Sequence, residues 1–248
     1  MTAKLAHIAR HPIKSHGREE LASVHLTTGQ GLPFDRHWAV AHDAAKLVPG
    51  WNDCVNFARG AKAPGLMAVS SQLDEDAATI TLMHPAKPDL TFRPDDVADL
   101  ARFLDWVHPL NPPDRAQPVK IVTAGRAMTD TDFASVSIFS LASNAALSAV
   151  MGQDLSPQRW RGNLWLGGLD PWAEFNWIGK TLHIGTAVFE VVQRITRCRA
   201  TMANPQTGLI DADTLGALKT TYGHQDFGVY ARVITGGTIA VSDTVVVV

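Results

Sequence analysis

The chain has 248 residues, of which 46% are hydrophobic and 19% are charged. This composition can bury one large core or two small ones, and it excludes an intrinsically disordered chain. The 22 lysine and arginine residues face 24 aspartate and glutamate residues, so the sequence lacks the basic surplus of proteins that bind nucleic-acid duplexes.

Strand signals dominate the first half of the chain. Alternating or clustered apolar residues predict strands at 5–9, 21–26, 38–41, 66–70 and 79–83. Apolar residues at helical spacing, preceded by acidic residues, predict a helix over 95–107. The segment 108–117 is rich in proline, which fixes φ and removes amide donors. We expect a loop there and place the best candidate for a domain boundary in it.

The second half repeats this pattern with two more helices. The charge-free stretch 133–153 contains five serines, so it predicts a buried strand and a helix rather than a membrane span. Ser140 is the expected cap of that helix, which ends near Gly152. The remaining expected elements are a strand at 120–123, a hairpin at 179–193, a helix at 213–222 and strands at 227–234, 238–241 and 244–248. Many short strands with few helices favour an antiparallel or mixed barrel.

The two cysteines, Cys54 and Cys198, are too few for a disulfide scaffold. The first 14 residues contain no apolar run of signal-peptide length. We therefore expect a cytoplasmic protein with reduced thiols and no membrane contact.

Cys198 lies in an unusually cationic segment, with Arg194, Arg197 and Arg199 close by in the sequence. Nearby cations favour a thiolate, so we expect a lowered pKa for this thiol if the guanidinium groups face it. A thiolate is a nucleophile and a soft metal ligand. The alternative is a buried cysteine on a strand whose arginines face water. Cys54 has no such neighbours and is expected to be structural.

Three further clusters place cations beside polar side chains at the ends of predicted strands. They are the segments 11–15, 34–38 and 159–164. Converging donors of this kind suit a phosphate or a flat heterocycle. Phosphate-loop, dinucleotide, nucleophile-elbow and zinc-protease motifs do not occur in the sequence.

Taken in order, these clusters resemble the MOSC family, named after the carboxyl-terminal domain of molybdenum cofactor sulfurases. The segments that carry the resemblance are 11–15, 31–38, 159–164, 197–198, 204–208, 227–230 and 237–243. They follow the family order and span nearly the whole chain. The sequence most resembles the branch of the mitochondrial amidoxime reducing component and its bacterial relatives, which bind the molybdenum cofactor and reduce N-hydroxylated compounds.

This resemblance implies a set of site residues. Cys198 matches the cysteine that coordinates molybdenum, and we expect it to act in catalysis with Asp132 and Arg161. The residues that match other cofactor-binding positions are Lys14, Ser15, Arg36, Asp132, Arg161, Asn163, Thr196, Arg197 and Tyr230. Gly162 stands where the family usually has proline, which we expect to loosen this loop.

The resemblance also implies the fold and the reaction. We expect a β-rich α+β protein in which a MOSC amino-terminal β-barrel-like region, residues 1–118, packs with a MOSC-type β-barrel domain, residues 119–248. The molybdenum cofactor, Mo-molybdopterin, would lie between them. The implied reaction is the two-electron removal of oxygen from hydroxylamines, amidoximes or N-oxides. A separate flavin, iron–sulfur or haem protein would supply the electrons. Two alternatives stay open: a sulfur carrier with a persulfide on Cys198, and a non-catalytic module that binds or stores the cofactor.

Overall fold

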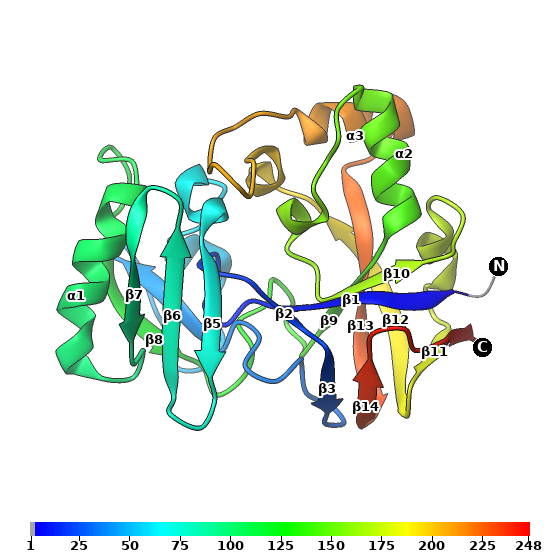
Figure 1. Ribbon diagram of the computed structural model, residues 1–248, viewed down its shortest axis with the longest axis horizontal. Helices are drawn as coiled ribbons and strands as arrows, with labels where there is room; N and C mark the ends of the chain where they lie inside the picture. Colours follow the sequence, from blue (N-terminus) through cyan, green and yellow to red (C-terminus); the bar gives the residue numbers. More distant parts are fainter. Residues whose placement is uncertain (1–2) are drawn as a thin grey trace.

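A computed structural model describes residues 3–248, in which strands outweigh helices. Within this range the strands form four sheets, of eight, three, two and two strands. The largest sheet lies to the right in Figure 1 and the three-stranded sheet lies to the left; the amino-terminal strand belongs to the largest sheet and runs from the right toward the centre. The predicted β-rich α+β class is confirmed.

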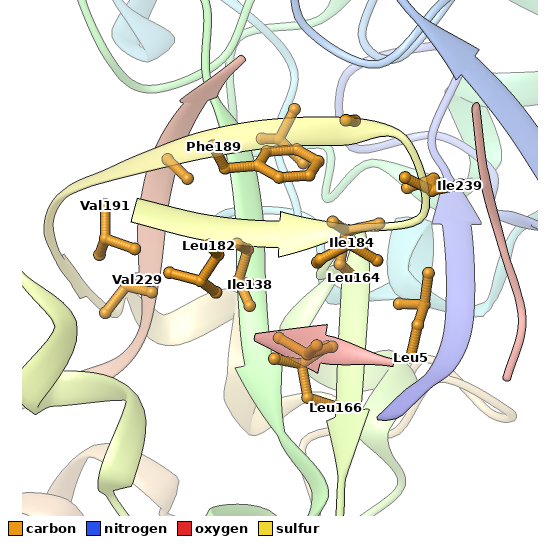
Figure 2. Close-up of a cluster of buried hydrophobic side chains, with 14 of the residues drawn as sticks. Leu5, Ile138, Leu164, Leu166, Leu182, Ile184, Phe189, Val191, Val229 and Ile239 are labelled. Carbon is orange, nitrogen blue, oxygen red and sulfur yellow. The ribbon is translucent and has the colours of Figure 1, made fainter. Parts of the chain in front are cut away.

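The eight-stranded sheet combines strands from both ends of the chain. In spatial order it contains β15 (Val245–Val247), β11 (Thr181–Ile184), β12 (Ala187–Thr196), β13 (Asp226–Thr235), β9 (Val136–Ser140), β10 (Leu164–Gly167), β1 (Lys4–Arg10) and β2 (Glu19–Leu21). Only β9 and β10 pair in parallel. The sheet curls around a core of aliphatic side chains that includes Leu5, Ile138 and Val229 (Figure 2). A shift of one residue would turn this apolar face to solvent, so burial fixes the register.

A second core fills the amino-terminal region. Its strands are β5 (Ser70–Asp74), β6 (Thr79–His84) and β7 (Lys87–Phe92), which form an antiparallel meander, and β4 (Trp38–His42), which pairs with β8 (Pro118–Thr123). Helix α1 (Val97–Val107) buries Phe103, Trp106 and Val107 in this core. It begins where the Asp96 carboxylate accepts a hydrogen bond from the Ala98 amide, as a helix cap should.

Helices α2 (Leu141–Met151) and α3 (Thr214–Tyr222) belong to the carboxyl-terminal half. Helix α2 begins after Ser140, whose hydroxyl accepts from the Ser143 amide, and ends at Gly152 with a left-handed φ of 61°. Both predicted ends of this helix are confirmed. No helix within residues 3–248 is long and apolar enough to cross a membrane.

The strand predicted at 66–70 is wrong for most of its length. Residues Pro64–Ala68 form a 3₁₀ helix, and β5 starts only at Ser70. Leu66, Met67 and Ala68 are all buried. The apolar run therefore lacks the alternation between a buried and an exposed face that marks a half-buried strand.

The two halves of the chain exchange strands. From the first half, β1 pairs with β10, and β3 (Ser23–Leu26) pairs with β14 (Gly237–Ala240). In the other direction, β8 begins at Pro118 and hydrogen-bonds to β4. The division at residue 118 stays a prediction. Strands from each side of this position pair with strands from the other side.

Arg18 fastens the two halves together with its side chain. Its Nε donates to Gln158 Oε1 at 3.0 Å, and its Nη1 donates to the carbonyls of Met67 at 2.9 Å and Val69 at 3.0 Å. Its Nη2 donates to the Pro205 carbonyl at 2.8 Å. One guanidinium thus bonds to two acceptors in the first half and two in the second.

We expect Arg18→Ala to lower the free energy of unfolding by about 2–4 kcal/mol, because several charge-assisted hydrogen bonds disappear together. Arg115→Ala is the matched control, since Arg115 pairs only with Asp114 at 3.7 Å on the surface. Its expected effect is below about 0.5 kcal/mol. Urea denaturation measures both, and equal effects would contradict the role given to Arg18.

A carboxyl group is buried in the second half without a cationic partner. Glu174 has no exposed surface, and the Ser143 hydroxyl lies 2.8 Å and 3.0 Å from its two carboxyl oxygens. Burial raises the pKa of Glu174 above its ordinary 4.5, and the hydrogen bonds only partly oppose this. Glu174 therefore binds its proton more tightly in the folded protein than in the unfolded chain.

A raised folded-state pKa adds stability below the unfolded-state value and loses it as the pH rises through the folded-state value. We expect Glu174→Gln to match the wild type near pH 4.5 and to be more stable at pH 8. The gap should be about 1.4 kcal/mol for each unit by which the pKa is raised. Unfolding measured across this pH range tests the sign, and a gap that shrinks with rising pH would contradict it.

Candidate functional site

Four cationic side chains from distant segments meet where the two halves join. Lys14 lies in the turn after β1, Arg36 precedes β4, Arg161 follows the 3₁₀ helix Pro157–Trp160, and Arg197 follows β12. Arg36 Nη2 donates to the Arg161 carbonyl at 2.8 Å. Arg197 Nη2 donates to the Trp160 carbonyl at 2.6 Å. We call this group, with Asp130, Cys198 and Tyr230, the cationic cluster.

The backbone around the cluster adopts a conformation that non-glycine residues seldom use. Ser15, Arg36 and Arg161 have φ values of 64°, 52° and 51°. Left-handed backbone costs such residues roughly 1–2 kcal/mol each and concentrates at functional sites. Three of the predicted site residues therefore carry this local strain.

Lys14 is buried, and its ammonium group makes two hydrogen bonds. Its Nζ donates to the Met128 carbonyl at 2.7 Å and to Asp130 Oδ1 at 2.5 Å. Partial burial raises the pKa of Asp130, but Lys14, Arg36 and Arg197 outweigh it and hold the pKa below its usual value. Asp130 is thus the carboxylate of the cluster.

Asp132, the acidic residue predicted from the sequence, does not form this contact with Lys14. The Asp132 side chain is exposed, as that of Asp130 is, but it is Asp130 that pairs with Lys14; the Asp132 carbonyl accepts a hydrogen bond from Arg126 at 2.6 Å. The two residues are only two positions apart in an irregular segment. No periodic pattern there could show which carboxylate turns toward Lys14.

A buried carboxylate holds Arg36 in place. Asp35 pairs with the Arg36 guanidinium and accepts a hydrogen bond from the His11 amide at 2.8 Å. Burial alone would raise the pKa of Asp35, but Arg36 and His11 hold it well below its usual range. Burial, followed by the charges of Arg161 and Arg36, lowers the pKa of His11 to about 3. His11 is therefore neutral at ordinary pH, and Asp35 stays charged.

Arg161 carries donors that nothing satisfies. Its Nη1 and Nη2 are buried and have no hydrogen-bond partner among residues 3–248. Burial and the neighbouring charges of Arg36 and Arg18 lower the pKa of Arg161 to about 9. Arg197 Nε is likewise buried without a partner in this range, and burial lowers its pKa. Buried donors of this kind need acceptors.

Cys198 is a free, exposed cysteine just beyond the end of β12. The interpretation as a buried strand cysteine is therefore wrong. Burial and then Asp130 raise the pKa of Tyr230, with a smaller contribution from Cys198. The phenol of Tyr230, on β13, thus shares an electrostatic environment with both residues and keeps its proton at neutral pH.

Two predicted site residues are occupied elsewhere. The buried Asn163 accepts from the Ser137 amide at 3.1 Å and its hydroxyl at 2.8 Å, and donates to the Ala9 carbonyl at 3.2 Å. Its amide thus ties β9 to β1. The exposed Thr196 hydroxyl donates to Asp226 at 2.7 Å. Both side chains support the strands from which the cluster projects.

Gly162 is required by packing. A Cβ at this position would lie 2.3 Å from the ring of Phe139, much closer than real side chains approach. The expected loosening of this loop is therefore wrong, because the missing side chain lets the ring pack against the backbone. Neither proline nor alanine would fit without a shift of Phe139.

The cluster fits a large anionic group with several acceptors. Lys14, Arg36, Arg161 and Arg197 provide four positive charges, and Asp35 and Asp130 compensate only two of them. A pyranopterin with its phosphate offers the acceptors that the buried guanidinium atoms lack. Within residues 3–248 no three His, Cys, Asp or Glu side chains are grouped to hold a metal ion.

Comparison with known families agrees with this site. Residues 126–246 match the family model described as the MOSC domain, and residues 2–108 match the MOSC N-terminal beta barrel domain. The chain carries both MOSC domains. MOSC domains in general bind the molybdenum cofactor. Lys14 and Arg36 come from the segment matched by the amino-terminal model, and Arg161, Arg197 and Cys198 come from the MOSC domain itself.

No curated protein matches the sequence. Among solved structures, the YuaD protein from Bacillus subtilis is 12% identical with a TM-score of 0.46, and the match covers 100% of this chain and 96% of that one. YiiM from Geobacillus stearothermophilus is 22% identical, with a TM-score of 0.36 and coverage of 46% and 53%. YiiM from Escherichia coli is 19% identical, with a TM-score of 0.34 and the same coverage.

The unsatisfied donors of Arg161 lead to a prediction of unusual sign. We expect Arg161→Met to stabilise the cofactor-free protein by about 1–3 kcal/mol, because it removes buried unpaired donors and a repulsive charge. The same variant should retain less cofactor. Urea unfolding of the cofactor-free protein and pterin content after expression are the two measurements.

Arg159→Met is the matched control. Arg159 lies two residues before Arg161 in the sequence, but its guanidinium bonds to Asp211 at 3.1 Å and to the Thr201 carbonyl at 3.0 Å. Its removal should destabilise the protein by about 3 kcal/mol. A loss of stability in both variants would contradict the account of Arg161.

Proposed function

We propose that this chain binds the molybdenum cofactor at the cationic cluster, with Cys198 as the metal ligand, and reduces N-hydroxylated compounds. The observation that carries the proposal is the pairing of buried, unpartnered guanidinium atoms with an exposed thiol at the same junction. The donors call for an anion, and the thiol offers a soft ligand that solvent can reach.

Each residue of the cluster has a part in holding the group. Lys14, Arg36 and Arg161 would contact the phosphate and the pterin, because they bring fixed positive charge from three separate segments. Asp35 keeps the Arg36 guanidinium in one orientation. Asp130 does the same for Lys14. These contacts exist before any ligand binds, so little order has to be gained on binding.

The reaction needs electrons, protons and a way for substrate to approach. When bound, the cofactor would supply two-electron redox chemistry for the removal of an oxygen atom. In balance, R–NH–OH, two electrons and two protons give R–NH₂ and water. The electrons come from a separate donor protein of flavin, iron–sulfur or haem type. The exposure of Cys198 leaves this end of the site open to substrate and donor.

Tyr230 is the group of this chain best placed to keep a proton near the reacting end. Its raised pKa leaves the phenol protonated at neutral pH, and Cys198 contributes to that rise. The phenolic Oη–H can therefore donate a hydrogen bond without carrying charge.

We expect Cys198→Ser to lower the reduction of an amidoxime with a chemical reductant by more than about 100-fold, since even the loss of groups that only support a metal ligand costs 10–100-fold. The protein is expressed in a cofactor-competent host, and molybdenum and pterin are measured per polypeptide. The variant should keep much of the pterin through the cationic residues and lose the metal contact of the thiol.

Cys54→Ser is the control, because Cys54 is half-buried and its sulfur accepts from Arg59 at 3.0 Å in the amino-terminal half. It should leave both metal and activity unchanged. Full reduction by Cys198→Ser would refute the ligand assignment. Wild-type protein without metal or pterin, but with a persulfide on Cys198, would instead support a sulfur carrier.

A further inference from the structure

A cavity of about 400 Å³ lies next to the cationic cluster and is distinct from it. It opens where the outward face of β1, which carries His7 and Ala9, and the following residue His11 meet the turn of Arg161. Of the cluster, only Arg161 lines it; Lys14, Arg36, Cys198 and Tyr230 do not. Its volume is that of a small-molecule site rather than of a packing defect.

One side of the cavity is flat and apolar. The Trp165 ring lines it and is held by stacking on Phe139, with ring centres 5.0 Å apart and an angle of 24°. Ala9 and Pro157 extend the same apolar lining. A rigid indole beside small apolar groups suits a flat ring.

The polar group with a defined preference is His11. The Asp35 carboxylate can only accept hydrogen bonds, and it lies 3.3 Å from His11 Nδ1. The proton of the neutral imidazole therefore sits on Nδ1, and Nε2 is left with its lone pair. Because His11 lines the cavity, its free nitrogen acts as an acceptor for a ligand.

The charges around the cavity cancel. Arg18 and Arg161 line it together with Glu19 and Glu20, two cations and two carboxylates. The donors of Arg18 are used on four protein acceptors, and Glu19 is bonded to Arg10 at 2.7 Å and to the Leu73 amide at 3.0 Å. The Nη atoms of Arg161 are buried and have no surface toward the cavity. The remaining charge, the exposed Glu20 carboxylate, is open to a cation. An anionic ligand would therefore lose its hydration here without gaining a free cationic partner.

We propose that this cavity is a second small-molecule site, which takes a flat aromatic compound without negative charge that donates an N–H or O–H hydrogen bond to His11 Nε2. The proposal does not depend on the reaction at the cationic cluster. It follows from the flat apolar wall, the oriented acceptor His11 and the engagement of the lining cations by the protein itself.

Four compounds with the same ring separate these three features. Benzamide is neutral and donates N–H, N,N-dimethylbenzamide is neutral without a donor, benzoate is an anion, and benzamidine is a cation at neutral pH. Ligand-observed NMR titration on the full-length protein measures each affinity. We expect benzamide to bind about three- to tenfold more tightly than its dimethyl derivative, the effect of one hydrogen bond. Benzoate should bind at least about tenfold more weakly than benzamide, whereas benzamidine should bind no more weakly, because the Glu20 carboxylate is open to a cation.

Variants that fill the cavity locate the binding. Ser70 on β5 and Gln206, in the loop after Cys198, both line it, so Ser70→Trp and Gln206→Trp should each abolish benzamide binding. Gln72→Trp is the control, because Gln72 lies two residues along the same strand and is exposed outside the cavity. Thermal unfolding of each variant confirms that it is folded.

Each other result would overturn the proposal. Benzoate as the tightest ligand would show that unpaired arginine donors govern the cavity. Equal binding of benzamide and its dimethyl derivative would remove the role of His11. Binding that survives both filling variants would place the ligand elsewhere, and an absence of binding by all four compounds would show that no such site exists.

Discussion

Repulsion among buried guanidinium groups is the constraint on which the rest of this structure depends. Burial, and then the charges of Arg36 and Arg18, lower the pKa of Arg161, and two of its donors are left without acceptors among residues 3–248. Such an arrangement is unfavourable in the protein by itself, and it persists only because the surrounding fold fixes its members. Asp35 holds Arg36, and four acceptors from both halves hold Arg18. An anion that enters the cluster would reduce the repulsion, so its binding would offset the free energy lost by burying these charges.

The exchange of strands explains how the fold can sustain this strain. β1 lies in the large sheet, and the turn that follows it places Lys14 at the junction. β4 starts just after Arg36 in the other region. Each half therefore contributes cations to the cluster and strands to the other half's packing. Separating the halves would break backbone ladders as well as the contacts of Arg18, which keeps the site preorganised.

The sequence allowed much of this to be predicted where a local rule decides the outcome. Helix α2 follows from the Ser140 cap and the left-handed Gly152, and Cys198 was singled out by its neighbouring arginines. The details that the sequence does not reveal are those that tertiary contacts decide. The choice of Asp130 over Asp132 depends on the position of Lys14, more than 100 residues away. The role of Asn163 depends on the pairing of β9 with its neighbours, and that of Gly162 on the ring of Phe139.

The central claim is that Cys198 is bound directly to molybdenum at the cationic cluster. X-ray absorption at the molybdenum edge, on protein purified from a cofactor-competent host, tests it most directly. The account predicts one more sulfur neighbour in the wild type than the cofactor itself supplies, and its loss in Cys198→Ser while the Cys54→Ser spectrum stays unchanged. An identical set of sulfur neighbours in the wild type and Cys198→Ser would contradict the account.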